Sequence, residues 1–416
     1  MRTKPWAIAA LGLATAINGT ALAGVAPAAR EHWVTSWYAA PQATWDGRFL
    51  LPMNVPAYLD NQSLRETVRL SAGGQRIRLV FSNRYGREPV RLGEVRVGPA
   101  DGSAPPRSLR FSGRQDASIA PGAVITSDPV ALALPPLSQL AVTSWLPSRT
   151  AVQSFHWGGQ QTIQLAGGNA LAAPGFAQAA RIGGRLFLAA VLVEAPQRAK
   201  TVVAFGDSIT DGNGSTPDAD RRWPDFLAQR LAHENIAVAN AGISGARLLK
   251  DGMGQSALAR FEQDVLSQPG VSDVIVLLGT NDIGWPGSPF APAEHAVSFE
   301  ALTLGYRQLA AAAHARGIRV TMGTLPPFEG ALEGTPYAGH YSLEKDRLRN
   351  RVNQWIREAG LFDAVADFDQ VLRDPARPQR LRTEFDSGDH LHPGDAGYRA
   401  MAAAIDIAPM VEENAR

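Results

Sequence analysis

The polarity pattern in the first half of the chain, from Trp33 to Leu165, alternates with a period of two residues. Glu66–Leu70, Ile77–Leu79 and Val90–Val97 show it, and glycine-containing turn signals separate these runs. In a strand, this alternation gives one buried face and one face in contact with solvent. Short strands at this spacing, with no long helical pattern between them, predict an all-β sandwich or jelly-roll domain.

The pattern changes near residue 200, where short continuous apolar runs replace the alternation. Such runs are typical of parallel strands that are covered on both faces. Between them lie stretches with apolar residues three and four positions apart, which predict helices. The runs are Thr201–Phe205, Ile236–Ala239, Val274–Leu278 and Val320–Met322, and the predicted helices are Trp223–His233, Ser256–Leu266, Phe299–Ala315 and Leu343–Glu358. This order predicts a doubly wound α/β domain, in which ligands bind outside the carboxyl ends of the strands.

The two patterns meet in the segment 178–196. It contains its own apolar run, Leu186–Val193, which we interpret as the last strand of the first domain. The sequence therefore predicts a β-sandwich domain over residues 30–195 and an α/β domain over residues 196–412. A β-rich domain of this kind either binds carbohydrate or only braces its neighbour, and the pattern favours neither.

The N-terminus has the three parts of a secretory signal peptide. Arg2 and Lys4 precede the apolar stretch Trp6–Ile17, and Ala21-Leu22-Ala23 follows it. A basic start, a short apolar centre and an A-x-A ending are typical of exported proteins. We expect cleavage near Ala23, with residues 1–23 removed, and a secreted or periplasmic protein. A hydrophobic first helix is the alternative.

Composition narrows the possible functions. The 416 residues include 40 Lys and Arg against 39 Asp and Glu, which gives a formal net charge of +1. The chain therefore has no strong positive electrostatic field that would attract a nucleic acid. The chain has no Cys, which excludes disulfides, thiolate–zinc sites and a cysteine nucleophile. No apolar run reaches the roughly 18 residues of a membrane span, so no stable membrane anchor is expected.

Four polar clusters follow the predicted strands or lie near the C-terminus. They centre on Ser208 in Gly-Asp-Ser, Gly242 in Asn-Ala-Gly, Asn281 in Gly-Thr-Asn-Asp, and Asp389 with His392 in Asp-His-Leu-His. A serine at a strand-to-helix turn can act as a nucleophile, and an Asp–His pair can act as a base with its orienting group. Backbone N–H groups and an Asn amide can stabilise an oxyanion. Taken singly, each cluster is equally a helix cap or a turn, but together they supply every part that acyl transfer needs.

The sequence contains no convincing motif for metal-dependent or other hydrolytic chemistry. The Asp and His residues near the C-terminus could bind a metal, but His295, His314 and His340 are scattered and offer no convincing further ligands, so no metal and no cofactor are expected. There is no Gly-x-Ser-x-Gly elbow, no P-loop and no His-Glu-x-x-His, which argues against ordinary α/β-hydrolase lipases, nucleotide hydrolases and zinc proteases.

The order of the four clusters resembles the SGNH (GDSL-type) hydrolase family, over about residues 201–405. The resemblance implies a flavodoxin-like three-layer α/β/α fold, with Ser208 as nucleophile, His392 as general base and Asp389 as the residue that orients it. It also implies an oxyanion hole formed by the Ser208 N–H, the Gly242 N–H and the Asn281 side chain. His390, between the Asp and the His, is interpreted as a polar loop residue.

A finer resemblance, to the XynE-like esterase branch, rests on the segment Trp33–Gln42, on Arg222-Trp223-Pro224-Asp225 and on the β-rich N-terminal part. It implies a secreted esterase that removes short acyl groups, acetyl above all, from carbohydrate. Two alternatives stay open: a broad short-chain arylesterase or lipase, and a carbohydrate-binding protein whose hydrolase domain is inactive. The expected partner is a small-molecule or polysaccharide ester, and the oligomeric state is left open.

Further residues are candidates for substrate contacts. Trp285, Phe328, Tyr337 and Tyr341 lie in or near loop segments rich in Gly and Pro, where aromatic rings either stack on a sugar or line an acyl pocket. The alternative is that these rings only pack their loops onto the domain. Asp211 is expected to shape the helix after Ser208 or to lie near the leaving group.

Overall fold

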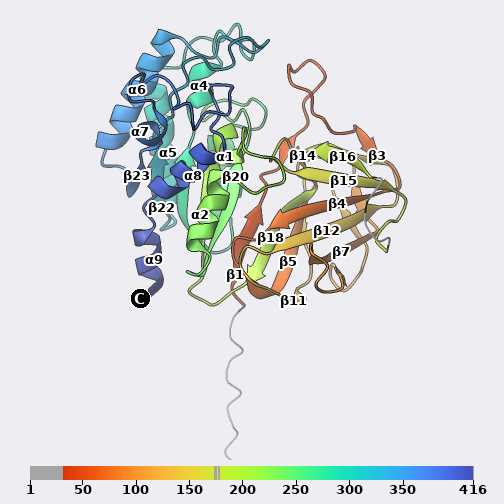
Figure 1. The fold of residues 1–416 in the computed structure, drawn as a ribbon. Coiled ribbons are helices and arrows are strands. Elements are labelled where there is room, and N and C mark those ends of the chain that lie inside the picture. Colours follow the sequence, from red (N-terminus) through yellow and green to blue (C-terminus); the bar gives the residue numbers. More distant parts are fainter. Residues whose placement is uncertain (1–30, 173–175, 177–178, 416) are drawn as a thin grey trace, which may run out of the picture. The chain divides into compact units, whose positions relative to one another are not determined.

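The computed structural model describes residues 31–172, 176 and 179–415. The predicted signal peptide, residues 1–23, lies outside the described residues. From His32 onward the chain forms one compact unit, in which antiparallel strands come before residue 195 and a parallel sheet follows (Figure 1). The division into separate domains at residue 195 stays a prediction. Within the described residues, no helix is both long enough and apolar enough to span a bilayer.

The N-terminal part is built on two antiparallel sheets. Apolar residues of both sheets, among them Leu64, Phe81 and Val142, share one core. One sheet contains β1 (Trp33–Tyr38), β18 (Leu188–Glu194), β5 (Gly74–Ser82), β10 (Val124–Thr126) and β11 (Val130–Leu134). The other contains β16 (Ala180–Gly183), β15 (Thr162–Gly167), β4 (Gln62–Arg69), β12 (Gln139–Leu146), β7 (Glu94–Pro99) and β8 (Arg107–Ser108). The predicted β-rich character is confirmed, and the jelly-roll arrangement stays a prediction.

Small sheets complete this part. The pairs are β3 (Tyr58–Leu59) with β13 (Thr150–Ala151), and β6 (Val90–Leu92) with β9 (Ala117–Ile119). A three-stranded sheet contains β17 (Arg185–Leu186), β14 (Ser154–His156) and β2 (Gln42–Ala43). The apolar run predicted as one strand over 186–193 is divided at Phe187, whose φ is +63°. Leu186 ends β17, and the residues from Leu188 onward form β18, the last strand of this part.

A second predicted strand is also divided in the structure. The alternation over Val90–Val97 predicted a single strand, but the structure divides it at Gly93 into β6 and β7. The two halves have different partners, since β6 pairs with β9 and β7 pairs with β12 and β8. Pairing with distant strands decided the break, and the local pattern does not contain that information.

The C-terminal part contains a five-stranded parallel sheet. Its order is β20 (Ile236–Gly242), β19 (Lys200–Gly206), β21 (Val271–Leu277), β22 (Arg319–Gly323) and β23 (Ala364–Ala366). In chain order this is 2-1-3-4-5, the flavodoxin-like arrangement, which places a ligand crevice where the order reverses, between the ends of the first and third strands. The predicted doubly wound sheet is confirmed, while β23 was not predicted.

The four helices that the spacing of apolar residues predicted are present, together with further helices that were not predicted. They are α1 (Ser208–Asp211), α2 (Trp223–Leu231), α3 (Ala257–Phe261), α4 (Thr280–Gly284), α5 (Phe299–His314), α6 (Leu343–Glu358), α7 (Phe368–Leu372), α8 (Asp395–Ala404) and α9 (Ala408–Ala415). Ser298 and Ser342 cap α5 and α6 with their hydroxyl groups, and α6 has the predicted bounds. The predicted helix Ser256–Leu266 continues after α3 as a π-helical turn, Glu262–Leu266.

A buried ion pair under this helix holds the ends of two central strands. The Arg260 guanidinium donates to the carbonyl oxygens of Gly206 (2.9 Å) and Ala241 (2.8 Å), and it pairs with Asp264 at 2.8 Å. The Tyr38 hydroxyl of β1 donates to Asp264 at 2.8 Å. Both charged side chains are 1% exposed. The carbonyls at the ends of β19 and β20 are thereby fixed to α3 and to the N-terminal part.

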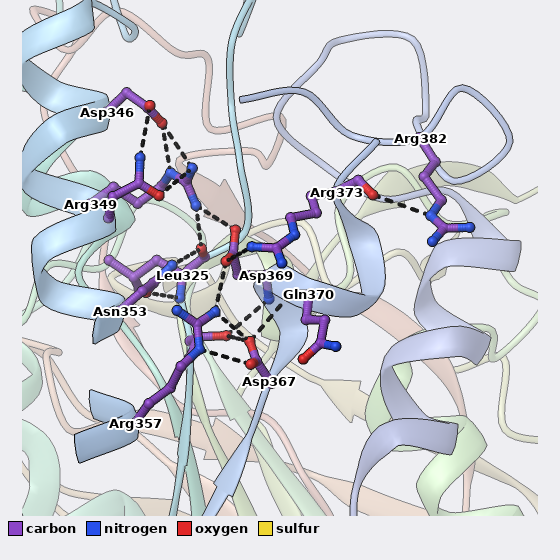
Figure 2. Close-up of polar contacts among 12 residues, drawn as sticks. Leu325, Asp346, Arg349, Asn353, Arg357, Asp367, Asp369, Gln370, Arg373 and Arg382 are labelled. Carbon is purple, nitrogen blue, oxygen red and sulfur yellow. Dashed lines mark hydrogen bonds and ion pairs between the residues drawn. The ribbon is translucent and has the colours of Figure 1, made fainter. Parts of the chain in front are cut away.

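A second buried polar network fixes the segment after β22 (Figure 2). Arg349 of α6 donates to the Leu325 carbonyl at 3.1 Å and pairs with Asp369 of α7 at 2.6 Å. The Asn353 side chain both accepts from Leu325 N–H (2.7 Å) and donates to its carbonyl (2.8 Å). Because this segment continues toward Tyr337, the network sets the path of a loop that reaches the candidate site.

Replacing Arg260 by Met should destabilise the fold by about 3–5 kcal/mol, because the buried Asp264 carboxylate loses its cation. The measurement is the free energy of unfolding in a denaturant titration. The matched control is Arg316→Ala, which removes a pair between exposed side chains, Arg316 and Glu262. That change should cost only about 0–1 kcal/mol. Equal effects of the two substitutions would mean that the buried pair does not stabilise the strand ends.

Candidate active site

Ser208 lies at the point where the first parallel strand ends and a short helix begins. β19 ends at Gly206, and the Asp207 carboxylate accepts a hydrogen bond from Ile209 N–H at 3.0 Å as the cap of α1. Ser208 is the first residue of that helix, where backbone N–H groups have no partner within the helix. Its side chain and its N–H are therefore presented at the carboxyl end of the sheet.

His392 and Asp389 meet Ser208 from the loop before α8. The His392 Nε2 lies 2.8 Å from the Ser208 Oγ, and its Nδ1 lies 2.6 Å from the Asp389 Oδ2. The other oxygen of Asp389 accepts from the N–H groups of Leu391 (2.9 Å) and His392 (2.8 Å). An imidazole that donates from Nδ1 to a carboxylate can take the serine proton at Nε2.

The charge state of Asp389 fits this arrangement. Burial opposes its ionisation, but the hydrogen bond and charge of His392 and the two backbone N–H groups outweigh burial and hold the pKa well below its usual range. The carboxylate is therefore ionised at neutral pH and keeps the His392 proton on Nδ1.

Asn281 reaches the same place from α4. One N–H of its amide donates to the Ala246 carbonyl at 3.1 Å, and an amide has two such hydrogens. The neighbouring carboxylate, Asp282, accepts from the N–H groups of Leu248 (2.6 Å) and Leu249 (3.0 Å). Since Asp282 is buried, it ties the loop after β20 to the helix that carries Asn281.

The structure does not bring Gly242 to the site, although the resemblance implied it as an oxyanion donor. Its N–H donates to the Asn240 side chain at 2.9 Å, and a Cβ there would lie 2.3 Å from the Asp211 nitrogen. Gly245, three residues later, has a φ of +68° and lines a cavity with Ser208 and Asn281. The segment 240–245 has the sequence Asn-Ala-Gly-Ile-Ser-Gly, so the sequence contained both glycines. Only the conformation of the loop shows which of the two lines the cavity.

A cavity of about 170 Å³ opens beside Ser208, and we call it the Ser208 cavity. Most of its lining is apolar. Predicted residues Trp285 and Tyr337 line it, and Phe290, which was not predicted, stacks between them with ring centroids 5.0 and 5.6 Å away. The full lining is Leu51, Trp157, Ser208, Asn213, Ser244, Gly245, Met253, Asn281, Trp285, Phe290, Leu332, Tyr337, His340, Leu391 and His392.

Phe328 and Tyr341 do not line this cavity. Phe328 is 1% exposed and packs edge-on against His340 and Tyr341, so it belongs to the core under the loop. His390 is exposed and pairs with Asp386, as expected of a polar loop residue. Across the described part of the chain, no three His, Cys, Asp or Glu side chains are grouped to hold a metal ion.

Asp211 is not a cavity residue either. It is 1% exposed, its Oδ1 lies 3.0 Å from His156 Nε2, and its Oδ2 accepts from the Ser244 hydroxyl at 2.7 Å. The other nitrogen of His156, on β14, donates to the Ala40 carbonyl at 3.0 Å. This contact joins the β-rich part to the short helix that begins at Ser208. A lone histidine in a strand gave no signal of this contact in the sequence.

Segments that follow three parallel strands, together with the loop before α8, thus place a hydroxyl, an imidazole, a carboxylate and amide donors around one small cavity, as in serine hydrolases. Residues 204–400 match the model of the GDSL-like lipase/acylhydrolase family. This part of the chain is therefore similar to that family of lipases and acylhydrolases.

Solved structures of two further proteins are similar to about half of the chain. A GDSL-like lipase from Bacteroides thetaiotaomicron VPI-5482 is 20% identical, with 51% of this chain and 88% of that chain covered and a TM-score of 0.37. The native aryl esterase of M. smegmatis is 20% identical, with 51% and 99% covered and a TM-score of 0.40. A search of curated proteins found no match.

Asp207, directly before Ser208, should make stability depend on pH. Burial raises its pKa to about 7 despite the hydrogen bond from Ile209 N–H. Since the unfolded value is about 4, the folded state penalises ionisation, and stability is lost as pH rises from about 4 to about 7. Asp207→Asn keeps a capping side chain without this penalty. The difference in unfolding free energy, variant minus wild type, should grow over that window to on the order of 4 kcal/mol and then level off.

Denaturant titrations at several pH values measure this difference. Other buried acids, such as Glu66, whose pKa burial raises to about 7, contribute equally to both proteins and cancel. A difference that does not change with pH would show that Asp207 ionises normally in the folded protein.

Proposed function

We propose that the chain is a serine esterase that hydrolyses short acyl esters. The observation that carries the proposal is the contact of His392 with both Ser208 and Asp389 at the mouth of a small apolar cavity. The nearby amide donors, Asn281 and the backbone of Ser208, complete the set of groups that acyl transfer requires.

In the proposed mechanism, the Ser208 Oγ attacks the ester carbonyl carbon while His392 Nε2 takes its proton. The carbonyl oxygen becomes an oxyanion, held by the Ser208 N–H, the Gly245 N–H and the Asn281 side chain. The bond to the alcohol then breaks, and His392 returns the proton to the departing oxygen. Water attacks the acyl-enzyme through the same base, which releases the acid and restores Ser208.

The size of the Ser208 cavity sets the length of the acyl group. An apolar cavity of about 150 Å³ holds a molecule of the size of benzene. At about 170 Å³, the Ser208 cavity takes an acyl chain of up to about six carbons, and acetyl fits without displacing a side chain. This supports a short-chain acyl substrate over the long chains of typical lipid hydrolases.

The finer assignment is an exported, XynE-like esterase that removes acetyl groups from carbohydrate. It rests on the N-terminal sequence pattern, on the segment Trp33–Gln42 and on the β-rich part. A broad short-chain arylesterase or lipase is the second candidate, favoured by the aromatic lining of the cavity by Trp285, Phe290 and Tyr337. An inactive carbohydrate-binding protein is disfavoured because the Ser208–His392–Asp389 contacts are intact.

Ser208→Ala should reduce the hydrolysis of p-nitrophenyl acetate by at least about a thousandfold, because the acyl-enzyme cannot form. The measurement is initial-rate kinetics, with circular dichroism to check folding. Asp389→Asn should also lose orders of magnitude, since the amide cannot hold the Nδ1 proton. A fully active Ser208→Ala protein would refute the mechanism. An inactive wild type would favour the binding-protein alternative.

Tyr337→Ala should lengthen the acyl group that the enzyme accepts, because it removes part of the cavity wall. The readout is the ratio of kcat/KM for p-nitrophenyl octanoate to that for p-nitrophenyl acetate. We expect this ratio to rise about tenfold or more, as one methylene in an apolar pocket is worth about 1–3 kcal/mol. Phe328→Leu is the matched control, because Phe328 is buried in the same loop without lining the cavity. An equal ratio in all three proteins would place the acyl chain elsewhere.

A further inference from the structure

A second cavity, of about 430 Å³, lies beside the Ser208 cavity, and we call it the Gln160 groove. The two share Trp157, Asn213 and His392 in their linings. The Gln160 groove also contacts Asp389, but none of the three oxyanion donors lines it. It therefore adjoins His392 without contacting the oxyanion donors.

The chemistry of ester hydrolysis indicates which part of the substrate lies beside His392. The imidazole that takes the nucleophile's proton must return it to the departing alcohol, so the alcohol lies beside His392. The acyl group and its oxygen lie on the other side, with Ser208, Gly245 and Asn281. We propose that the Gln160 groove binds the alcohol part of the ester, and that this alcohol is a polyhydroxylated one such as a sugar. The inference rests on the proposed esterase function.

The lining of the groove fits a polar alcohol. Asn54, Gln160, Gln161 and Thr162 supply amide and hydroxyl groups, and Trp157 adds one aromatic ring. The Gln160 amide donates one hydrogen bond to the Asn213 side chain at 3.1 Å, and the Gln161 amide donates one to Asp220 at 2.8 Å. Convergent polar groups with an aromatic face fix the orientation of a hydroxylated ligand. A fatty alcohol would leave the remaining donors and acceptors of these amides without a partner on the ligand.

The N-terminal part provides most of this wall and holds it rigidly. Thr162 is bound through its N–H and its hydroxyl to Asp218, each at 2.7 Å. His156, directly before Trp157, forms the buried pair with Asp211, which follows Ser208 on the same short helix. The segment 156–162 is thus fixed to the segment that carries the nucleophile, so the β-rich part contributes to the site and sets the choice of alcohol.

The experiment compares two esters that share the acetyl group and differ only in the alcohol. Acetylated xylobiose carries a polar alcohol and hexyl acetate an apolar one, and kcat/KM is measured for both. The variants are Gln160→Met, which keeps the side-chain length, and Asn54→Gly, which tolerates the φ of +59° at that position. Each should lower the ratio of kcat/KM for the sugar ester to that for hexyl acetate by about 3- to 10-fold, the worth of one hydrogen bond.

The matched control is Gln75→Met. Gln75 is an exposed glutamine on β5 that does not line the groove, and its replacement should leave the ratio unchanged. A second readout is acyl transfer with p-nitrophenyl acetate as donor. A hydroxyl of added xylobiose attacks the acyl-enzyme in place of water, which gives acetylated xylobiose and free Ser208, and both variants should reduce this product relative to acetate.

The outcomes separate the two proposals. Failure of wild type to hydrolyse any of these esters would refute the esterase function itself. An active wild type that prefers hexyl acetate, or variants that change both esters by the same factor, would refute the alcohol-binding role of the groove and leave the esterase function standing.

Discussion

The site depends on one buried interaction, the Arg260–Asp264 ion pair behind the parallel sheet. Arg260 donates to the carbonyl groups of Gly206 and Ala241. These residues lie at the ends of β19 and β20, directly before the Ser208 helix and the Gly245 loop. Two carbonyls without a donor, beside an unpaired buried carboxylate, would cost several kcal/mol. The pair therefore ties the position of the nucleophile to the stability of the fold. Tyr38, which donates to Asp264, extends this dependence to the N-terminal part.

The β-rich part and the α/β part share one site. His156 reaches from β14 to Asp211, and Asp211 in turn accepts from Ser244, the neighbour of Gly245. Aromatic rings also join the two parts. The Phe49 ring of the N-terminal part contacts the rings of Trp285 and Phe290, at centroid distances of 6.5 and 6.4 Å. The surroundings of Ser208 are accordingly built by both parts, and neither part alone lines the cavities beside it.

Three carboxylates near the site, of which Asp207 and Asp282 are buried and Asp389 is partly exposed, differ in their pKa shifts for a clear physical reason. Asp207 and Asp282 accept only backbone N–H groups, and burial raises the pKa of Asp207 to about 7 and that of Asp282 to about 6. Asp389 faces His392 as well as backbone N–H groups, and these together outweigh burial. Asp389, which must be ionised to orient the base in the proposed mechanism, is thus the carboxylate that has an imidazole as a hydrogen-bond partner. The other two carboxylates hold loops in place.

The sequence by itself determined the local features: strands from apolar runs, α6 from the spacing of its apolar residues, and the polar residues that follow the strands. Parallel strands bring their carboxyl ends to one edge, so the polarity pattern was enough to predict Ser208 and Asn281 as neighbours. His392 follows no predicted strand, and its pairing with Ser208 was expected from the order of the four clusters. The choice of Gly245 over Gly242, the burial of Asp211 against His156, the division of Val90–Val97 and the wall around Gln160 were decided only by the tertiary structure. Each depends on a partner dozens or more residues away or on the turn of a loop, and a local pattern of polarity contains neither.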